Sequence, residues 1–169
     1  MNMLKSENLI FDEKKIKYCT KRIAYQIYES NIKSKEIFLV GIAENGCIFA
    51  NEIEKNLNDI TKIKITTLKL EIDKKNPRNK ISLDSEVKKL ENKSIVIIDD
   101  VLNTGLVFAY ALRFLLNINI KQIKIAVLVN REHNKFPIKA DYKGISLSTS
   151  VNETVKVNLI GKQRGIYLV

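Results

Sequence analysis

Residues 94–105 read Ser-Ile-Val-Ile-Ile-Asp-Asp-Val-Leu-Asn-Thr-Gly, and this stretch decides the fold. Its first five residues form an apolar run rich in β-branched side chains, which predicts a strand covered on both faces. Two adjacent acids, Asp99 and Asp100, follow that strand directly. A short Asn-Thr-Gly loop then leads into residues 105–117, whose apolar spacing favours a helix.

The same alternation of strand and helix continues along the rest of the chain. Helical spacing predicts further helices over residues 12–31, with Asp12 as the cap, and over residues 45–58. Strands are expected at residues 36–42, 62–72 and 123–129, and shorter ones around 145–148, 154–159 and 166–169. This order predicts one α/β domain over residues 1–169 with a largely parallel central sheet. Ligands of such sheets bind outside the carboxyl ends of the strands, so the residues after each strand are the candidates for a site.

Composition excludes several classes of protein. The chain has 169 residues, a hydrophobic share of 45% and a formal net charge of +10. It therefore has enough apolar residues for a core, and no apolar run approaches the roughly 20 residues that span a bilayer. The first ten residues lack a signal-peptide pattern, so a cytoplasmic protein is expected. Two separated cysteines and a single histidine argue against a disulfide scaffold and a multi-histidine metal site.

The turn after the acidic pair has the chemistry of a sugar-phosphate site. The Asn103-Thr104-Gly105 loop offers backbone N–H groups, a hydroxyl and a helix N-terminus, which suit a phosphate monoester. The two carboxylates suit a ribose diol, or a Mg²⁺ ion that bridges to phosphates. A capped helix after a buried strand, with two solvated acids, is the plainer alternative. The basic balance also allows a polyanionic partner such as RNA, although lysine is used heavily along the whole chain.

At these residues the sequence resembles a known family. IVIIDDVLNTG (residues 95–105) is similar to the phosphoribosyl diphosphate (PRPP) signature of type I phosphoribosyltransferases. FLVGIAENG (residues 38–46) and AVLVNREHNKFPIKADYKGISLSTS (residues 126–150) resemble the pyrimidine operon attenuator/uracil phosphoribosyltransferase family, and the likeness runs in order over residues 12–159. The resemblance implies a type I phosphoribosyltransferase fold with a small hood. It also implies Mg²⁺-dependent transfer of phosphoribosyl from PRPP to uracil, giving UMP and diphosphate, and in some members binding to pyrimidine-operon mRNA.

The resemblance also implies roles for particular residues. Asp99 and Asp100 would hold the ribose hydroxyls as the catalytic acids, and Mg²⁺ would arrive with PRPP and touch the protein through water only. The 5′-phosphate would be wrapped by Asn103, Thr104, Gly105, Leu106 and Val107. The diphosphate loop would be Ala43, Glu44, Asn45 and Gly46, covered by a flexible flap over residues 73–93 with the cations Lys74, Lys75, Arg78 and Lys80. The base hood would contain Asn130, Arg131, Pro137 and Ser148, and an RNA face would contain Lys21, Arg22, Arg131 and His133.

Two loops depart from the family pattern. The family usually follows Thr-Gly with Arg-Thr or Lys-Thr, whereas this chain has Leu106-Val107, and it commonly has a basic residue before Gly46, where this chain has Asn45 preceded by Glu44. The first interpretation is a uracil phosphoribosyltransferase, with reduced activity because of these losses. A nucleotide-sensing, RNA-binding regulator without turnover is the second, and an enzyme for another acceptor is the third. The strongly apolar helix over residues 105–117, together with the family, predicts a homodimer or higher homo-oligomer.

Overall fold

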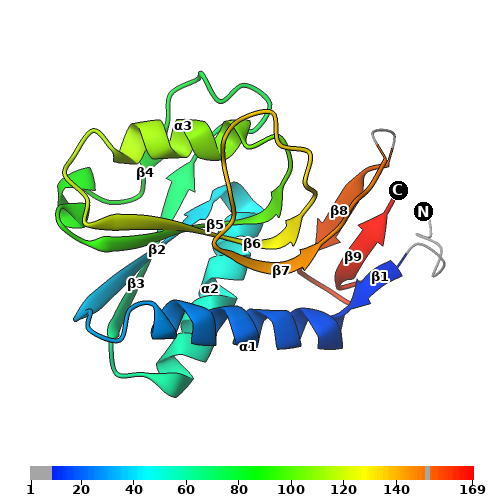
Figure 1. The fold of residues 1–169 in the computed structure, drawn as a ribbon, viewed down its shortest axis with the longest axis horizontal. Helices are drawn as coiled ribbons and strands as arrows, with labels where there is room; N and C mark the ends of the chain where they lie inside the picture. The colour runs from blue at the N-terminus through cyan, green and yellow to red at the C-terminus, as the bar shows by residue number, and fades with distance from the viewer. Residues whose placement is uncertain (1–8, 151–152) are drawn as a thin grey trace.

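The computed structural model of the protein describes residues 9–150 and 153–169 (Figure 1). Its helices are α1 (Glu13–Glu29), α2 (Ala43–Ile60) and α3 (Leu106–Leu115), with a short 3-10 helix, η2 (Val87–Leu90). Its strands are β1 (Leu9–Asp12), β2 (Glu36–Ile42), β3 (Lys64–Glu71), β4 (Ser82–Leu83), β5 (Ser94–Leu102), β6 (Gln122–Asn130), β7 (Tyr142–Ser146), β8 (Val155–Asn158) and β9 (Gly165–Leu168).

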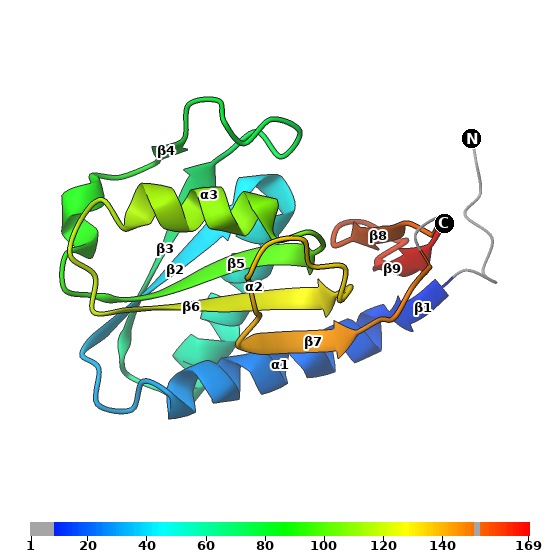
Figure 2. The same ribbon diagram turned by 45° about the horizontal axis from the view of Figure 1, so that its top comes forward.

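Six strands form the central sheet in the order β4-β3-β2-β5-β6-β7. The five strands from β3 to β7 in this order are parallel, and only the short edge strand β4 is antiparallel. Helices α1 and α2 cover one face of this sheet and α3 covers the other (Figures 1 and 2). The predicted α/β fold with a largely parallel sheet is therefore confirmed.

Burial on both faces explains why β5 reads as an unbroken apolar run. Successive side chains of a strand point to opposite faces. Val96 and Ile98 pack into the core under α1 and α2, whereas Ile95 and Ile97 pack into the core under α3. All four side chains are buried, so β5 is the central strand that joins the two cores.

A second, three-stranded sheet in the order β1-β9-β8 lies beside the carboxyl ends of β5 and β6 (Figure 2). It stands where a small hood is expected. Strand β1 at the start of this sheet was not predicted, because a four-residue strand leaves little periodicity. Its last residue, Asp12, also caps α1 by accepting a hydrogen bond from the Lys15 N–H at 2.8 Å, as predicted.

Three predicted boundaries are wrong in ways that affect the site. Strand β5 continues to Leu102, so the two acids lie within the strand rather than after it. Helix α2 begins at Ala43, so residues 43–46 are its first turn and not a loop. The connection over residues 73–93 contains β4 and η2 instead of being irregular throughout.

The strongly apolar sequence of residues 105–117 predicts a helix that is buried on most sides, but in the single chain α3 is buried only on the side that faces the sheet. Only Phe108, Ala111 and Leu115 are buried on it, against the sheet. Its outer apolar side chains, including Tyr110 and Phe114, are half-buried and border a shallow pocket with residues 77–81. No helix in the described part of the chain is long and apolar enough to cross a bilayer.

Candidate functional site

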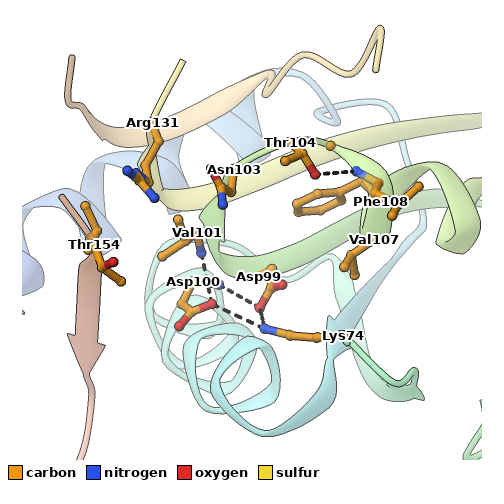
Figure 3. A pocket seen from close by; sticks show the side chains of 13 residues that line it. Lys74, Asp99, Asp100, Val101, Asn103, Thr104, Val107, Phe108, Arg131 and Thr154 are labelled. Carbon is orange, nitrogen blue, oxygen red and sulfur yellow. Dashed lines mark hydrogen bonds and ion pairs between the residues drawn. The ribbon is translucent and has the colours of Figure 1, made fainter. Parts of the chain in front are cut away.

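A cavity of about 370 Å³ opens at the carboxyl end of β5 (Figure 3). It is bounded by the end of β5, the first turn of α3, the residue after β6, the start of β8 and one residue of the 73–93 connection. Its lining residues are Lys74, Asp99, Asp100, Val101, Asn103, Thr104, Gly105, Leu106, Val107, Phe108, Arg131, Thr154 and Val155. The acidic pair and the whole predicted phosphate loop therefore share one cavity.

The acidic pair is held rigidly by the backbone that follows it. Asp99 is only 2% exposed, and its carboxylate accepts a hydrogen bond from the Asp100 N–H at 2.9 Å. The Asp100 carboxylate accepts from the Val101 N–H at 2.9 Å and from the Asn45 side-chain amide at 2.7 Å. Strand β2 pairs with β5 only as far as Ile98, so at this end of the strand the carboxylates satisfy backbone donors themselves.

Lys74 lies over both acids (Figure 3). Its Nζ is 2.7 Å from Asp99 Oδ1 and 3.4 Å from Asp100 Oδ1. The Lys74 side chain is 37% exposed, whereas the two carboxylate side chains are 4% and 13% exposed. Of the four flap cations expected from the sequence, this is the one that lines the cavity.

Burial and the neighbouring charges separate the pKa values of the two acids. Burial, and then the charge of Asp100, raises the pKa of Asp99 well above its usual range. Burial would raise the pKa of Asp100 too, but the charge of Lys74 and the hydrogen bonds from Asp99 and Asn45 outweigh it and lower that pKa. Burial opposes the charge of Lys74, yet the two carboxylates raise its pKa. The cluster therefore favours a charged Asp100 and Lys74 beside an Asp99 that takes up a proton readily.

The raised pKa of Asp99 predicts a pH-dependent effect of Asp99→Asn on stability. Folding favours the protonated acid, so the stability contributed by Asp99 is complete below its ordinary pKa of 3.8 and is lost as pH rises through the raised value. The asparagine mimics the protonated acid at every pH. We expect Asp99→Asn to be more stable, relative to the wild type, at pH 7 than at pH 4, as measured by urea unfolding at the two pH values. An equal difference at both pH values would contradict this assignment.

The predicted phosphate loop, residues 103–107, forms a tight turn between β5 and α3 and the start of that helix. Gly105 has a φ of 88°, a left-handed conformation that favours glycine, and a Cβ there would lie 3.0 Å from the side chain of Ile138. The Thr104 hydroxyl accepts from the Leu106 N–H at 3.3 Å, and the Thr104 carbonyl accepts from the N–H groups of Lys135 and Phe136. The segment after β6 thus fixes the loop from outside, and α3 begins directly behind it.

The expected diphosphate loop, in contrast, contributes no residue to the lining of the cavity. Glu44 is 84% exposed on its side chain and pairs with Lys69 at 2.9 Å. The Asn45 amide faces Asp100 and the carbonyl of Val157. Ala43 has a φ of 48°, a strained conformation for a residue with a Cβ. The role of this turn in binding diphosphate stays a prediction.

Gly46 has a packing reason that the sequence does not reveal. A Cβ at this position would lie 2.6 Å from the Ile98 carbonyl oxygen and 3.2 Å from Asp99 Oδ1. The absent side chain lets α2 approach β5 just where the acidic pair begins. We expect Gly46→Ala to lower the free energy of unfolding by about 1–3 kcal/mol, because such overpacking forces the backbone to shift. Urea denaturation checks this, and an unchanged midpoint would show that the contact is easily relieved.

Of the four expected hood residues, only Arg131 lines the cavity. It is 7% exposed, and its guanidinium donates to the Thr149 hydroxyl and to the Glu153 carbonyl. Asn130, Pro137 and Ser148 lie outside the lining, and the Ser148 hydroxyl is 3.3 Å from a Glu132 carboxylate oxygen.

Four residues that line the cavity were not singled out from the sequence, namely Val101, Phe108, Thr154 and Val155. The first two continue the strand and the helix of the signature, so the alternation of β5 and the spacing of α3 carried some signal for them. Thr154 and Val155 reach the cavity only through the placement of the small sheet.

The four expected RNA-face residues differ in the hydrogen bonds that they make within the protein. Arg22 donates to the carbonyls of Lys143 and Gly144, and Arg131 is buried as described. His133 Nε2 lies 2.7 Å from the Thr149 carbonyl oxygen, and Lys21 is exposed. Arg131 and His133 both line a neighbouring cavity of about 460 Å³, whereas Lys21 lines a separate one beside α2. An RNA surface at these positions stays a prediction.

The donor set fits a magnesium ion that arrives with its substrate. No group of three or more histidine, cysteine, aspartate or glutamate side chains within the described ranges is placed to hold a metal. Mg²⁺ keeps several waters and commonly binds through one or two carboxylates together with substrate phosphates. The carboxylates of Asp99 and Asp100, beside the predicted phosphate loop, suit such an ion, with the predicted contact made through its waters.

Comparisons with known proteins agree with this geometry. The model of the phosphoribosyl transferase domain matches residues 8–159. The Bifunctional protein PyrR of Leuconostoc mesenteroides is 36% identical over 155 residues, covering 88% of this chain and 89% of its own. The protein of the same name from Clostridioides difficile is 35% identical over 159 residues, covering 89% and 90%.

Solved structures show the same fold at low sequence identity. The hypoxanthine phosphoribosyltransferase of Trypanosoma cruzi superposes with a TM-score of 0.80 at 16% identity over 95% of both chains. The hypoxanthine-guanine phosphoribosyltransferase of Bacillus anthracis gives a TM-score of 0.72 at 17% identity, covering 85% of this chain and 84% of that one. The domain match and the PyrR relatives each span most of the chain, and the protein therefore belongs to the type I phosphoribosyltransferases and, among them, to the PyrR family.

Proposed function

We propose that this protein transfers the 5-phosphoribosyl group of PRPP to uracil, giving UMP and diphosphate. The observation that carries the proposal is the single cavity in which the acidic pair and the Asn103–Val107 loop lie side by side. A vicinal diol and a phosphate monoester on one ribose match these two groups of donors and acceptors. The PyrR relatives support the choice of a pyrimidine base.

The ribose 5-phosphate part of PRPP fits the donors and acceptors of the cavity wall. The two ribose hydroxyls donate to the carboxylates of Asp99 and Asp100, which are charge-assisted acceptors. The 5′-phosphate accepts from the Thr104 hydroxyl and from backbone N–H groups at the start of α3, where the helix dipole favours an anion. These contacts fix C1 of the ribose in place relative to β5.

The transfer breaks the bond between C1 and the diphosphate oxygen, and the electron pair leaves with diphosphate. Positive charge develops on the ribose ring, and N1 of uracil then bonds to C1 while its proton passes to water. Asp99 and Asp100 would hold, through its waters, a Mg²⁺ ion that arrives with PRPP, and the ion would supply positive charge to the diphosphate group. The protein stabilises the charges with fixed groups and keeps water from C1. We place the base against Arg131, Thr154 and Val155, which line the cavity. Arg131 and Thr154 lie on the opposite side of the acidic pair from Lys74 (Figure 3).

The test is a calorimetric titration of PRPP with Mg²⁺ into the purified protein, followed by uracil in the same cell and assay of UMP. We expect PRPP to bind and UMP and diphosphate to appear in equal amounts. Binding of PRPP or UMP without turnover would overturn the catalytic proposal. Binding of neither ligand would overturn any role for this cavity in nucleotide chemistry.

A nucleotide-sensing regulator without turnover is a second candidate, and one observation favours it. Residues 43–46 carry no cation, and Glu44 adds a negative charge on the side of β2 where the family resemblance expects diphosphate. A protein that binds UMP and RNA without catalysis would tolerate this charge. Filter binding of a pyrimidine-operon leader RNA tests that role: affinity should be strong at low salt and fall steeply as salt rises. Affinity that stays low at every salt concentration would exclude this candidate.

We also propose that the protein is a homo-oligomer, through the half-buried apolar side chains on the outer face of α3. Sedimentation at micromolar concentration tests this. A single monomer peak would contradict it.

A further inference from the structure

Lys74 is the one cation that contacts the acidic pair within residues 9–150 and 153–169. It makes a short ion pair, at 2.7 Å, with a nearly buried carboxylate. Charges paired at a buried site attract each other more strongly than exposed ones, because less water screens them. Lys74 therefore occupies Oδ1 of both carboxylates, which the ribose hydroxyls need as acceptors under the proposed function.

A local turn places Lys74 over the acids. The Asp73 carboxylate accepts from the N–H groups of Lys75 and Asn76, at 2.9 and 3.1 Å, and from the Asn79 amide at 2.9 Å. Ile72, just before the turn, is buried in the core under α3. The backbone of residues 73–79 is thus shaped independently of the acidic pair, and Lys74 can leave the acids by rotating its own side chain.

Near the expected diphosphate loop, the other charged side chains are acids or a lysine that is already paired with them. Lys69, the other lysine close to this end of β3, is paired with both Glu44 and Glu71, at 2.9 and 2.6 Å. The turn over residues 43–46 holds no cation of its own. Lys74 is the remaining positive charge that lines the cavity next to Asp99, and Arg131 lines it on the opposite side (Figure 3).

We propose that Lys74 is an exchangeable cation of this site: it pairs with Asp99 and Asp100 in the free protein and passes to the diphosphate group of PRPP when the ribose hydroxyls take its place. The inference rests on the proposed function, and it gives the chain a replacement for the basic residue that residues 43–46 lack. It also makes the site selective, because only a ligand with an anionic group on C1 can form a new ion pair with the displaced lysine.

This exchange predicts opposite effects on two related ligands. Ribose 5-phosphate has the diol and the 5′-phosphate but no diphosphate, so it must break the Lys74 ion pairs without replacing them. PRPP breaks the same ion pairs and forms new ones with the displaced ammonium. Removal of the Lys74 charge should therefore weaken PRPP binding and strengthen ribose 5-phosphate binding.

The experiment compares Lys74→Gln, Lys74→Arg and the wild type by calorimetry with PRPP and Mg²⁺, and separately with ribose 5-phosphate. Lys74→Gln should bind PRPP roughly tenfold or more weakly, the value of one charge-assisted contact, and ribose 5-phosphate about threefold or more tightly. Lys74→Arg should keep both affinities near those of the wild type. Lys89→Gln is the matched control, since Lys89 is an exposed lysine of the same connection outside the cavity, and it should change neither affinity.

Two other results would contradict the proposal. One would exclude the exchange by Lys74, and the other would exclude this cavity as the PRPP site. If Lys74→Gln weakens both ligands equally, or alters neither, Lys74 is a structural or idle cation and the inference is wrong. If the wild type binds neither ligand, the proposed function fails first and the inference fails with it. Circular dichroism of each variant shows whether it is folded.

Discussion

Replacing both acids, Asp99→Asn with Asp100→Asn, should abolish detectable PRPP binding and with it any UMP formation. Each ribose hydroxyl loses a charged acceptor, worth about 1.5–3 kcal/mol, so the two changes together should weaken binding about 100-fold or more. The substitution also removes both partners of Lys74. Calorimetry with PRPP and Mg²⁺ measures the loss, and ribose 5-phosphate should lose affinity as well because it shares the diol.

The stability of the double variant shows whether PRPP binding is lost through a missing contact or through unfolding. Asparagine has the shape of aspartate, and burial penalises the charge of Asp99, whereas Lys74 and Asn45 stabilise the charge of Asp100, so the double variant should stay folded but unfold at a somewhat lower urea concentration than the wild type does. Asp59→Asn with Glu91→Gln is the matched control, since both residues are exposed and lie outside the cavity while the net charge changes equally. Unchanged PRPP binding in the Asp99/Asp100 variant would move the ligand to another part of the protein.

The fold and the centre of the site could be predicted because their signals are local. The apolar run of β5 requires cover on both faces, and the left-handed Gly105 after Thr104 marks the turn into α3. Strand, acids, loop and helix are consecutive in the chain, so no long-range arrangement had to be known. The family resemblance then predicted a chemistry for these residues, which the proposed function adopts.

The parts that could not be predicted depend on contacts between distant residues. Lys74 reaches Asp99 across 25 positions of sequence, through a turn that Asp73 organises. Thr154 enters the cavity only because β8 pairs with β9 and stands beside β5. A loop was expected over residues 43–46 because they resemble the family's diphosphate loop, whereas they form the first turn of α2, in which Gly46 allows the close approach to Ile98. Sequence periodicity carries no information on any of these distances.

Restoring the residue types that the family has at the two positions after Gly105 should strengthen PRPP binding. The family resemblance predicts a hydroxyl and a cation at the two positions after Gly105, where this chain has Leu106 and Val107. Both side chains line the cavity and are half-buried, so Leu106→Lys with Val107→Thr places a charge and a hydroxyl beside the bound phosphate without filling the core. Val107→Thr is also nearly isosteric. We expect PRPP to bind at least roughly tenfold more tightly, since a contact to a charged group contributes about 1.5–3 kcal/mol.

The ligand series shows where such a gain comes from. PRPP and ribose 5-phosphate share the 5′-phosphate, so both should gain by a similar factor, whereas inorganic diphosphate should gain little. Val87→Thr is a matched control for the added hydroxyl, because Val87 is also half-buried but lies in η2, outside the cavity. A gain confined to PRPP would place the 5′-phosphate elsewhere and the diphosphate at this loop. No gain with either ligand would mean that the backbone N–H groups and Thr104 already satisfy the phosphate, and that the loss of the family's cation left binding intact.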